Sequence, residues 1–556
     1  MSIFSKIPIT RPKRSTFVQQ HEWLGTYSEG ILYPLGCTEI MSGDTASDEC
    51  HFYLRMAPMQ APIMQNINCY VRHFFIPFRL LVRDFEKFIT GGKKGDFTGV
   101  LPWISYNSIG VDNTYHGSLI DHLGYPTING FKEYDSLSKL NMLDKIELRN
   151  LQYVLAYHRI WYDYFRDETI TQVSDELIDL IDDGLPLGQV QSLPNGFFDL
   201  HKVCWSKDYF TSALPDPQRG VDVTIPINGN FRVEGDPDLA KINGPVTGIF
   251  QDSGSSAEFG PMYNTLGSIG YVDNGGESTG TQRGLLSFDN TNLKVTQDGT
   301  SSVTVNDLRT AFGLQRIFEK LARSGSRYVE WLRSFFGEAP TDATLQRAQY
   351  LGGGRTPITI SEVLQNSQTT TGDDASPLGQ PAGRGTALGS TNGFKRHFKE
   401  PGVLMSVMYI RPQQMYTNLY PRHLLRRTRF DFAFPDLAHL GEQPIQQCEL
   451  QGLRPTTDID DSDAPFGYQS RYSEYKYTPS TVHGDFKGNM AFWHMARNFG
   501  WGSPALLNQS FLEVNASDFD RVWNVDDSVA NGHYWMQFYH NMKFTRNLPY
   551  FGEPKL

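Results

Sequence analysis

Cysteine is scarce in this chain of 556 residues, and the short motifs that mark catalytic sites are absent. The five cysteines form no CxxC pair, which argues against a zinc knuckle and a disulfide framework and favours buried thiols. No GxxxxGK[ST], HExxH or GxSxG motif occurs, and no two histidines are spaced to share one helix face. The sequence therefore predicts no catalytic residue and no cofactor. The cysteines are Cys37, Cys50, Cys69, Cys204 and Cys448.

Long apolar runs are also missing. No stretch approaches the roughly 20 apolar residues that a membrane span needs, and the first residues lack the basic, apolar and small-residue order of a signal peptide. We therefore expect a soluble protein that folds in a cytoplasm without membrane insertion. The formal net charge is -11, so broad coating of nucleic acid is excluded and any such contact must be local.

Aromatic residues, glycine and proline are plentiful, which favours strands, turns and long loops over a helical bundle. Strands are predicted over 51–59, 66–78, 402–412, 471–479 and 533–545. The third of these is apolar on both faces, as expected of a strand buried on both sides or at a subunit contact. Because strands gather near both ends of the chain, N-terminal strands must pair with C-terminal ones, as in a Greek-key sandwich that carries insertions.

Helices are predicted in the middle of the chain. Apolar residues recur three or four apart within 139–166 and again within 306–336, where Asn306 is a plausible cap and Gly337 a plausible end. A loop-rich passage is expected over 352–393. The apolar face of the first helix comprises Leu151, Val154, Leu155, His158, Trp161 and Phe165.

Three features that resemble functional motifs have plainer explanations. The segments GGKKGD (91–96) and YLGGGRT (350–356) lack the lysine and hydroxyl of a phosphate-binding loop, so we expect flexible turns. His158 lies on an apolar stripe, where a packed histidine is expected rather than a ligand. The acidic segment 458–467 lacks the glycine and the later glutamate of an EF-hand, so a solvated loop is favoured over calcium binding. Its candidate calcium ligands are Asp458, Asp460, Asp461 and Asp463.

The stretch 221–300 differs from its surroundings. It is rich in turn residues and carries ten acidic residues against four basic ones. A surface that faces DNA would carry the opposite sign. We therefore expect an exposed insertion that points outward.

Basic residues gather in two other places. The first twenty residues form a basic arm without acidic residues, and FKRHFK (394–399) and RHLLRRTRFDF (422–432) interleave cations with phenylalanines. Such a combination neutralises phosphates and stacks unpaired bases, although arginines also form ion pairs within a chain or between subunits. The candidate DNA-contacting residues are Lys6, Arg11, Lys13, Arg14, Arg426, Arg427 and Arg429.

A series of unusual strings runs in order along nearly the whole chain. The strings are APMQAPIMQ (57–65), FFIPFRLLVRDFEKFITGG (74–92), AYHRIWYDYFRDE (156–168), DYFTSALPDPQRG (208–220), SGSRYVEWLRSFFG (324–337), LQRAQYLGGGRTPITIS (345–361), FDFAFPDLAHLGEQPI (430–445), FGYQSRYSEYKYTPSTVHGDF (466–486), WHMARNF (493–499) and NLPYFGEPKL (547–556). Together they resemble the major capsid protein of the Microviridae, and within it a gokushovirus-like or related subgroup. These phages are small, tailless and icosahedral, with single-stranded DNA genomes.

The resemblance implies a mainly β fold, an eight-stranded antiparallel jelly roll with long helical and loop insertions. It also implies a non-enzymatic shell subunit of the virion, assembled in the host bacterial cytoplasm. The expected partners are further copies of the chain, the DNA genome, scaffolding, DNA-pilot and small basic DNA-binding proteins, and a host receptor. The expected segments are 1–20 (basic arm), 21–220 (first strands and helical insertion), 221–304 (exposed acidic insertion and surface protrusion), 305–400 (helical and Gly-rich insertion) and 401–556 (C-terminal strands and loops).

One alternative belongs to a different class of protein. Aromatic-rich β-sandwiches commonly bind sugars, so a carbohydrate-binding protein or a glycoside-active enzyme is the competing hypothesis. Such an enzyme needs two carboxylates that converge in a cleft, and no motif in the sequence indicates them.

Overall fold

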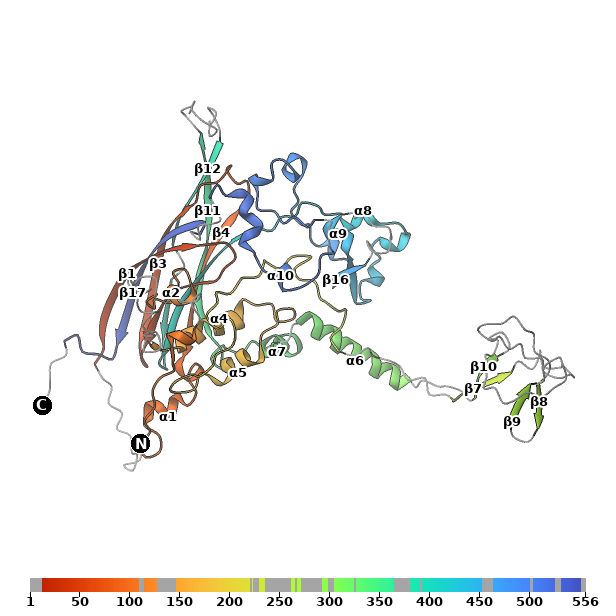
Figure 1. Cartoon of the computed structure of the whole chain (residues 1–556), viewed down its shortest axis with the longest axis horizontal. Coiled ribbons are helices and arrows are strands. Elements are labelled where there is room, and N and C mark those ends of the chain that lie inside the picture. Colours follow the sequence, from red (N-terminus) through yellow and green to blue (C-terminus); the bar gives the residue numbers. More distant parts are fainter. Residues whose placement is uncertain are drawn as a thin grey trace. The chain divides into compact units, whose positions relative to one another are not determined.

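Apolar residues alternate with period two along the strands of the central sheet. Figure 1 shows this sheet in a computed structural model of the chain. The chain divides into two compact units, Met1–Arg219 with Glu319–Leu556, and Gly220–Phe318. The structure describes residues 13–109, 115–127, 147–220, 223, 230–235, 262–265, 268–271, 293–298, 305–324, 327–364, 381–390, 393–452, 464–500, 504–525 and 532–551.

Eight long strands of the first unit form an antiparallel sheet in the order β1-β17-β3-β12-β11-β4-β14-β2. A short ninth strand, β13 (Phe394–His397), pairs with β3. The eight are β1 (Ser15–Tyr27), β2 (Tyr33–Ile40), β3 (Thr45–Met56), β4 (Ile67–Pro77), β11 (Gln349–Leu364), β12 (Pro381–Ser390), β14 (Gly402–Pro412) and β17 (Tyr534–Arg546).

The sheet folds over on itself at β11. The first part of this strand, Gln349 to Ile358, pairs with β4, whereas Thr359 to Leu364 pairs with β12. Two layers of four strands result, β1-β17-β3-β12 and β2-β14-β4-β11. This arrangement confirms the predicted eight-stranded jelly roll and the predicted pairing of N-terminal with C-terminal strands.

The core between the layers follows from the alternation along β17. Tyr534, Met536, Phe538, Met542 and Phe544 are all buried, as the sequence pattern predicts for one face of this strand. The predicted double burial of β14 is also confirmed. Its even-numbered residues contribute to the cores between the layers, and its odd-numbered residues pack beneath the helical insertion.

Two predictions for segments rich in glycine or loop residues are wrong. YLGGGRT (350–356) lies inside β11, and the passage 352–393 contains most of β11 together with β12. Close strand packing requires glycine at position 353, because a Cβ at Gly353 would lie 2.2 Å from the carbonyl oxygen of Val71. A glycine-rich stretch can therefore pair as a strand where no side chain fits. The other segment, GGKKGD (91–96), forms turns as predicted.

The strand predicted over 471–479 is also wrong. Tyr472 has a φ of 64°, and residues Ser473–Tyr475 form a 3₁₀ turn. The backbone N–H of Tyr472 donates to Gln443 at 3.2 Å, and the hydroxyl of Ser473 donates to the carbonyl oxygen of Ser470 at 2.7 Å. One hydrogen bond to distant Gln443 and one to nearby Ser470 replace the ladder that the tyrosine alternation suggested.

Helices occupy the insertion between β4 and β11 and also the one between β14 and β17. Gly337 ends α7 in a left-handed conformation, as predicted, but α6 begins at Val305, so Asn306 lies inside its first turn instead of capping it. Among the described residues, no helix is long and apolar enough to cross a bilayer. The helices are α1 (Phe85–Thr90), α2 (Leu119–His122), α4 (Gln152–Tyr164), α5 (Asp175–Asp183), α6 (Val305–Ser324), α7 (Tyr328–Phe336), α8 (Arg422–Leu425), α9 (Gln447–Gln451) and α10 (Gln509–Leu512).

Short strand pairs complete the description. In the first unit β5 (Trp103–Ser105) pairs with β6 (Glu147–Arg149), and β15 (Glu442–Gln446) pairs with β16 (Pro465–Ser470). In the second unit β7 (Asn230–Gly235) pairs with β10 (Leu293–Asp298), and β8 (Met262–Thr265) pairs with β9 (Ser268–Tyr271).

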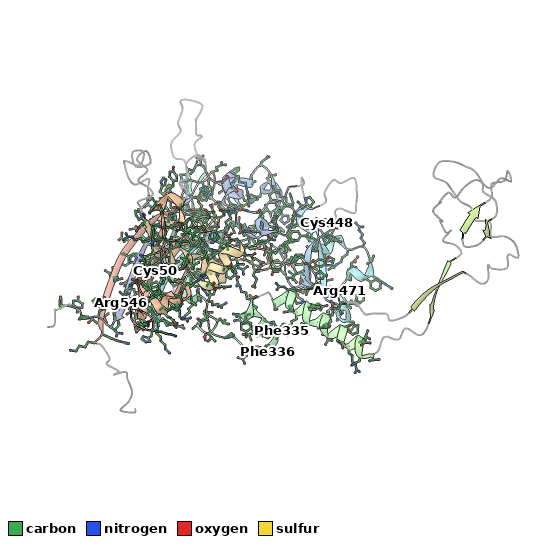
Figure 2. All side chains as sticks on the ribbon, turned by 60° about the horizontal axis from the view of Figure 1, so that its bottom comes forward. Cys50, Phe335, Phe336, Cys448, Arg471 and Arg546 are labelled. Carbon is green, nitrogen blue, oxygen red and sulfur yellow. The ribbon has the colours of Figure 1, made fainter. Side chains whose placement is uncertain are left out.

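None of the five cysteines forms a disulfide bond. Cys50, Cys69 and Cys448 are buried, whereas Cys37 and Cys204 are partly exposed; Figure 2 shows Cys50 among the strands and Cys448 near the other end of the first unit. Burial raises the pKa of Cys37 to about 12, so this thiol stays protonated and unreactive at neutral pH.

Buried histidines make the fold sensitive to acid. Burial lowers the pKa of His73, His122 and His158 to about 4. His73 shares a 2.8 Å hydrogen bond with Ser406, and His158 is packed, as predicted, with its Nε2 2.6 Å from the carbonyl oxygen of Phe197. The folded chain keeps these rings neutral, whereas the unfolded chain protonates them near pH 6.5.

We therefore expect the free energy of unfolding to fall as the pH drops from about 6.5 to about 4, because only the unfolded state takes up the protons. Urea titrations across this range measure the slope. The variant His73→Gln should flatten it, while His423→Gln, at an exposed histidine, should not. Equal slopes in the parent and both variants would contradict the assignment.

Candidate nucleic-acid interface

The insertion between β14 and β17 shares a small core with the segment around Phe210, which precedes β11 in the chain. Phe210, Tyr416, Ile445, Leu450 and Phe466 are buried together there. The basic segment 422–440 leaves this core as α8 and continues in two 3₁₀ turns that the sheet does not cover. It therefore presents its side chains at the surface of the first unit.

Arg422 anchors the start of this segment. Its guanidinium donates to the carbonyl oxygen of Pro444 at 2.6 Å and to Glu449 at 3.0 Å. Glu449 is almost fully buried, and burial raises the pKa of its carboxyl group. The hydroxyl of Tyr209 donates to the second carboxylate oxygen of Glu449 at 3.0 Å. Arg422 is therefore a structural residue whose charge is compensated within the chain.

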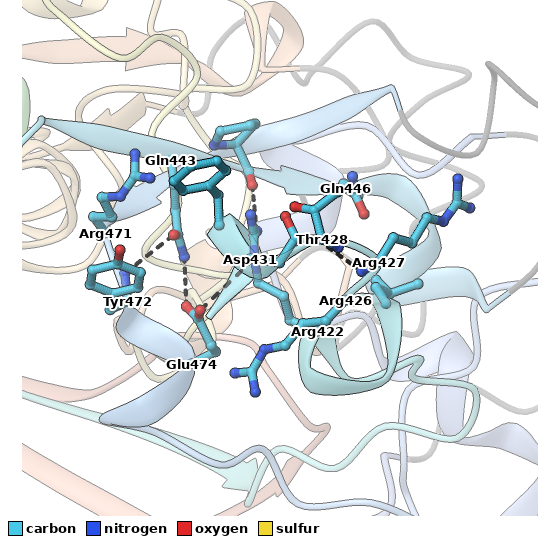
Figure 3. Close-up of a pocket in the computed structure, with 13 residues that line it drawn as sticks. Arg422, Arg426, Arg427, Thr428, Asp431, Gln443, Gln446, Arg471, Tyr472 and Glu474 are labelled. Carbon is cyan, nitrogen blue, oxygen red and sulfur yellow. Dashed lines mark hydrogen bonds and ion pairs between the residues drawn. The ribbon is translucent and has the colours of Figure 1, made fainter. Parts of the chain in front are cut away.

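Arg426 and Arg427 line a cavity of about 460 Å³, together with Arg422 and Arg471. Figure 3 shows the guanidinium groups of Arg427 and Arg471 on opposite sides of it, with Arg422 between them. The guanidinium of Arg426 lies 5.1 Å from the ring centre of Phe432 and 4.8 Å from that of Tyr475. Phe430 and Tyr472 also line the cavity, so it combines cations with aromatic rings.

The acidic residue of this loop is turned toward the backbone. Asp431 accepts the backbone N–H groups of Arg427 at 2.8 Å and Thr428 at 2.6 Å. These hydrogen bonds lower the pKa of Asp431 and hold the turn in place. Within the described part of the chain, neither Arg427 nor Arg429 forms an ion pair. Both guanidinium groups are free to meet an anion.

Exposed phenylalanine rings lie in the same segment as Arg427 and Arg429. Phe430, Phe432 and Phe434 are 57%, 54% and 41% exposed, and the guanidinium of Arg429 lies 4.7 Å from the ring centre of Phe430. Cations beside exposed rings can neutralise phosphates and stack unpaired bases. We define Arg426, Arg427, Arg429, Phe430 and Phe432 as the arginine loop.

The other predicted site residues do not join the arginine loop. Lys13 and Arg14 are exposed just before β1, where Arg14 donates to the side chain of Asn547 at 3.0 Å. In Figure 1, β1 lies on the opposite side of the first unit from α8. Lys6 and Arg11 lie outside the described residues, as do Asp458, Asp460, Asp461 and Asp463. No cluster of three potential metal ligands occurs among the residues that are described.

A second surface with cations and aromatic rings was not predicted from the sequence. It is the outward face of β1-β17-β3-β12, which carries Trp535 and Tyr539 on β17 beside Tyr53 and Arg55 on β3. The signal was present in 533–545, because the residues that alternate with its buried face include two aromatic ones. Only the strand register places them beside β3.

Comparisons with known proteins give the family of this chain. The chain matches the capsid protein (F protein) family over residues 5–556. It is 30% identical over 624 residues to capsid protein VP1 of Chlamydia phage 1, which covers 100% of this chain and 97% of that protein. For capsid protein VP1 of Bdellovibrio phage phiMH2K the identity is 31%, with 97% and 95% covered.

A more distant relative extends the comparison. Capsid protein VP1 of Spiroplasma virus 4 is 24% identical, with 98% of this chain and 95% of that protein covered. These matches span almost the full length of each protein and confirm the resemblance drawn from the ordered strings. The chain therefore belongs to the capsid protein (F protein) family of the Microviridae, and it is a structural protein of the virion capsid rather than an enzyme.

Proposed function

We propose that many copies of this chain close into an icosahedral shell around a single-stranded DNA genome, with scaffolding, DNA-pilot and small basic DNA-binding proteins as assembly partners. The observation that carries the proposal is the family match over residues 5–556, supported by the eight-stranded jelly roll. Closed symmetry reuses the same contacts in every copy, so weak individual contacts suffice.

Electron microscopy of particles from the native source tests this proposal. We expect uniform icosahedral shells whose major protein is this chain. Particles that contain the chain only as a minor component, or no particles at all in DNA-containing fractions, would contradict it.

Within that shell the arginine loop and the basic N-terminal arm contact DNA without reading its sequence. For the arginine loop, the support comes from the surroundings of Arg427 and Arg429. Two exposed guanidinium groups have no ionic partner among the described residues, and exposed phenylalanine rings lie beside them. Phosphate contacts of this kind depend on charge and weaken with salt.

The paired substitution Arg427→Gln with Arg429→Gln should lower the DNA content of purified shells or the salt concentration at which they release DNA. Each lost phosphate contact reduces the salt dependence of binding by about 0.7 in the logarithmic slope. The matched control is Lys93→Gln with Lys94→Gln, which removes two charges from an exposed turn elsewhere.

Neutralising Lys6, Arg11, Lys13 and Arg14 tests the arm in the same assay. If the loop and arm variants both match the parent in DNA content and salt dependence, the proposal that these residues contact DNA is wrong. Failure of the loop variant to form empty shells would instead identify a contact between subunits and would also contradict it.

Residues 221–304 form the surface protrusion that meets the host cell. Their acidic composition supports an outward position, since a DNA-facing surface would be basic. Residues Gly220–Phe318 form a compact unit of their own, which supports a role separate from that of the jelly roll.

Replacement of 221–304 by a short glycine-serine linker should leave shells that assemble and package DNA but adsorb poorly to host cells. The reason is that a separate compact unit can be removed without opening the core of the jelly roll. Adsorption is measured against parental shells of equal DNA content. Undiminished adsorption would count against the attachment role.

A further inference from the structure

The outward face of the layer β1-β17-β3-β12 is exposed in the first unit. Its inward face packs on the core, and Figure 1 shows the helices on the opposite side of these strands. Leu24 on β1 and Leu388 on β12 are each 81% exposed, and Trp535 on β17 is 43% exposed. Exposed apolar and aromatic side chains that gather on one face make it a candidate binding surface.

The strand register arranges aromatic rings across this face. Gln537 is opposite Tyr53, while Trp535 is opposite Arg55 and Tyr539 is opposite His51. Tyr53 is therefore the diagonal neighbour of both Trp535 and Tyr539, at about 7–8 Å between backbone positions. That spacing is comparable with the step between successive nucleotides of an extended strand.

Cations lie on the same face as the rings. Arg55 donates to the hydroxyl of Tyr53 at 3.0 Å and lies 5.2 Å from its ring centre. Hydrogen bonding by Arg55, together with the nearby Arg384, lowers the pKa of Tyr53. Lys543 on β17 and Lys395 on β13 both lie opposite Ser47 of β3.

Negative charge on the face is sparse. Its acidic residues are Glu22 and Glu49, and Glu22 accepts a hydrogen bond from Gln537 at 2.9 Å. Arg55, Arg384, Lys395 and Lys543 form no ion pairs with the residues that the structure describes. Four cations against two carboxylates make this face locally positive in a chain of net charge -11.

We propose that this face binds single-stranded DNA, with Tyr53, Trp535 and Tyr539 stacking on bases while Arg55, Arg384 and Lys543 hold phosphates. The inference rests on the proposed enclosure of a DNA genome and adds a second contact surface to it. A flat sheet favours unpaired bases, because its rings cannot reach bases stacked inside a duplex. The core of a protein interface would be depleted of charge, whereas cations here alternate with rings. The face also continues from the basic arm, since β1 begins directly after Lys13 and Arg14.

Binding of a fluorescein-labelled oligothymidine to the full chain tests the proposal across a salt series. Trp535→Ala and Tyr53→Ala should each weaken binding by about 10-fold, as expected for loss of one stacked base. Trp535→Phe should retain most of the affinity, because it keeps a ring. Arg55→Gln with Lys543→Gln should reduce the logarithmic salt slope by about 0.7 per lost phosphate contact. Tyr328→Ala, at a 63% exposed ring on α7, is the matched control and should bind like the parent.

Other outcomes would overturn the proposal. Parental affinity and salt slope in all the sheet variants, with unchanged thermal unfolding, would remove this face as a DNA site. Loss of empty-shell assembly in the sheet variants, with oligothymidine binding intact, would assign the face to a second copy of the chain. The arginine-loop variant is measured in parallel. A defect there alone leaves the proposed function standing without this inference, and a defect in the sheet variants alone supports this inference and contradicts the loop assignment.

Discussion

β17 lies between β1 and β3, so the last strand of the chain completes a layer that the first strand begins. This pairing joins residues more than 500 positions apart, such as Thr16 and Thr545. The entropic cost of closing so long a loop grows only with the logarithm of its length. Long insertions are therefore compatible with the jelly roll, provided that the buried faces of β17 and β3 match in register.

Buried polar groups hold the insertions in place through hydrogen bonds. Glu29 accepts a hydrogen bond from the indole of Trp523 at 2.9 Å and lies 2.8 Å from His533. Arg159 of α4 donates to the carbonyl oxygens of Leu80, Ile181 and Gln346, which belong to different parts of the first insertion. Such groups are costly to bury without partners, so each fixes one arrangement of its loops. The same rigidity positions the arginine loop, because Arg422 just before it is held by the buried carboxylate of Glu449, while Arg427 and Arg429 form no ion pair with the described residues.

The two cationic surfaces of the first unit differ in construction. The arginine loop depends on local turns and on one buried ion pair, whereas the outward sheet face depends on the register of four strands. Both kinds fit the proposed DNA contacts, because neither requires a pocket specific for one base. Sequence-independent DNA binding needs charge and exposed rings, and both can be supplied by residues that the core does not use.

The sequence by itself determined the strands with clear alternation, the helices of the middle segment and the basic segment 422–440, since each depends on neighbouring residues. It also determined the family, which depends on strings that occur in order along the chain. The glycines of 350–356 suggested a turn, but contact with β4 made them a strand, because only glycine fits beside Val71. The tyrosines of 471–479 suggested a strand, but hydrogen bonds to distant Gln443 and nearby Ser470 made them a turn. Tertiary structure alone decided that Arg422 is neutralised while Arg427 is free, and that Tyr53 and Trp535 share one face. These outcomes depend on pairing and burial between segments far apart in the chain, which no local pattern specifies.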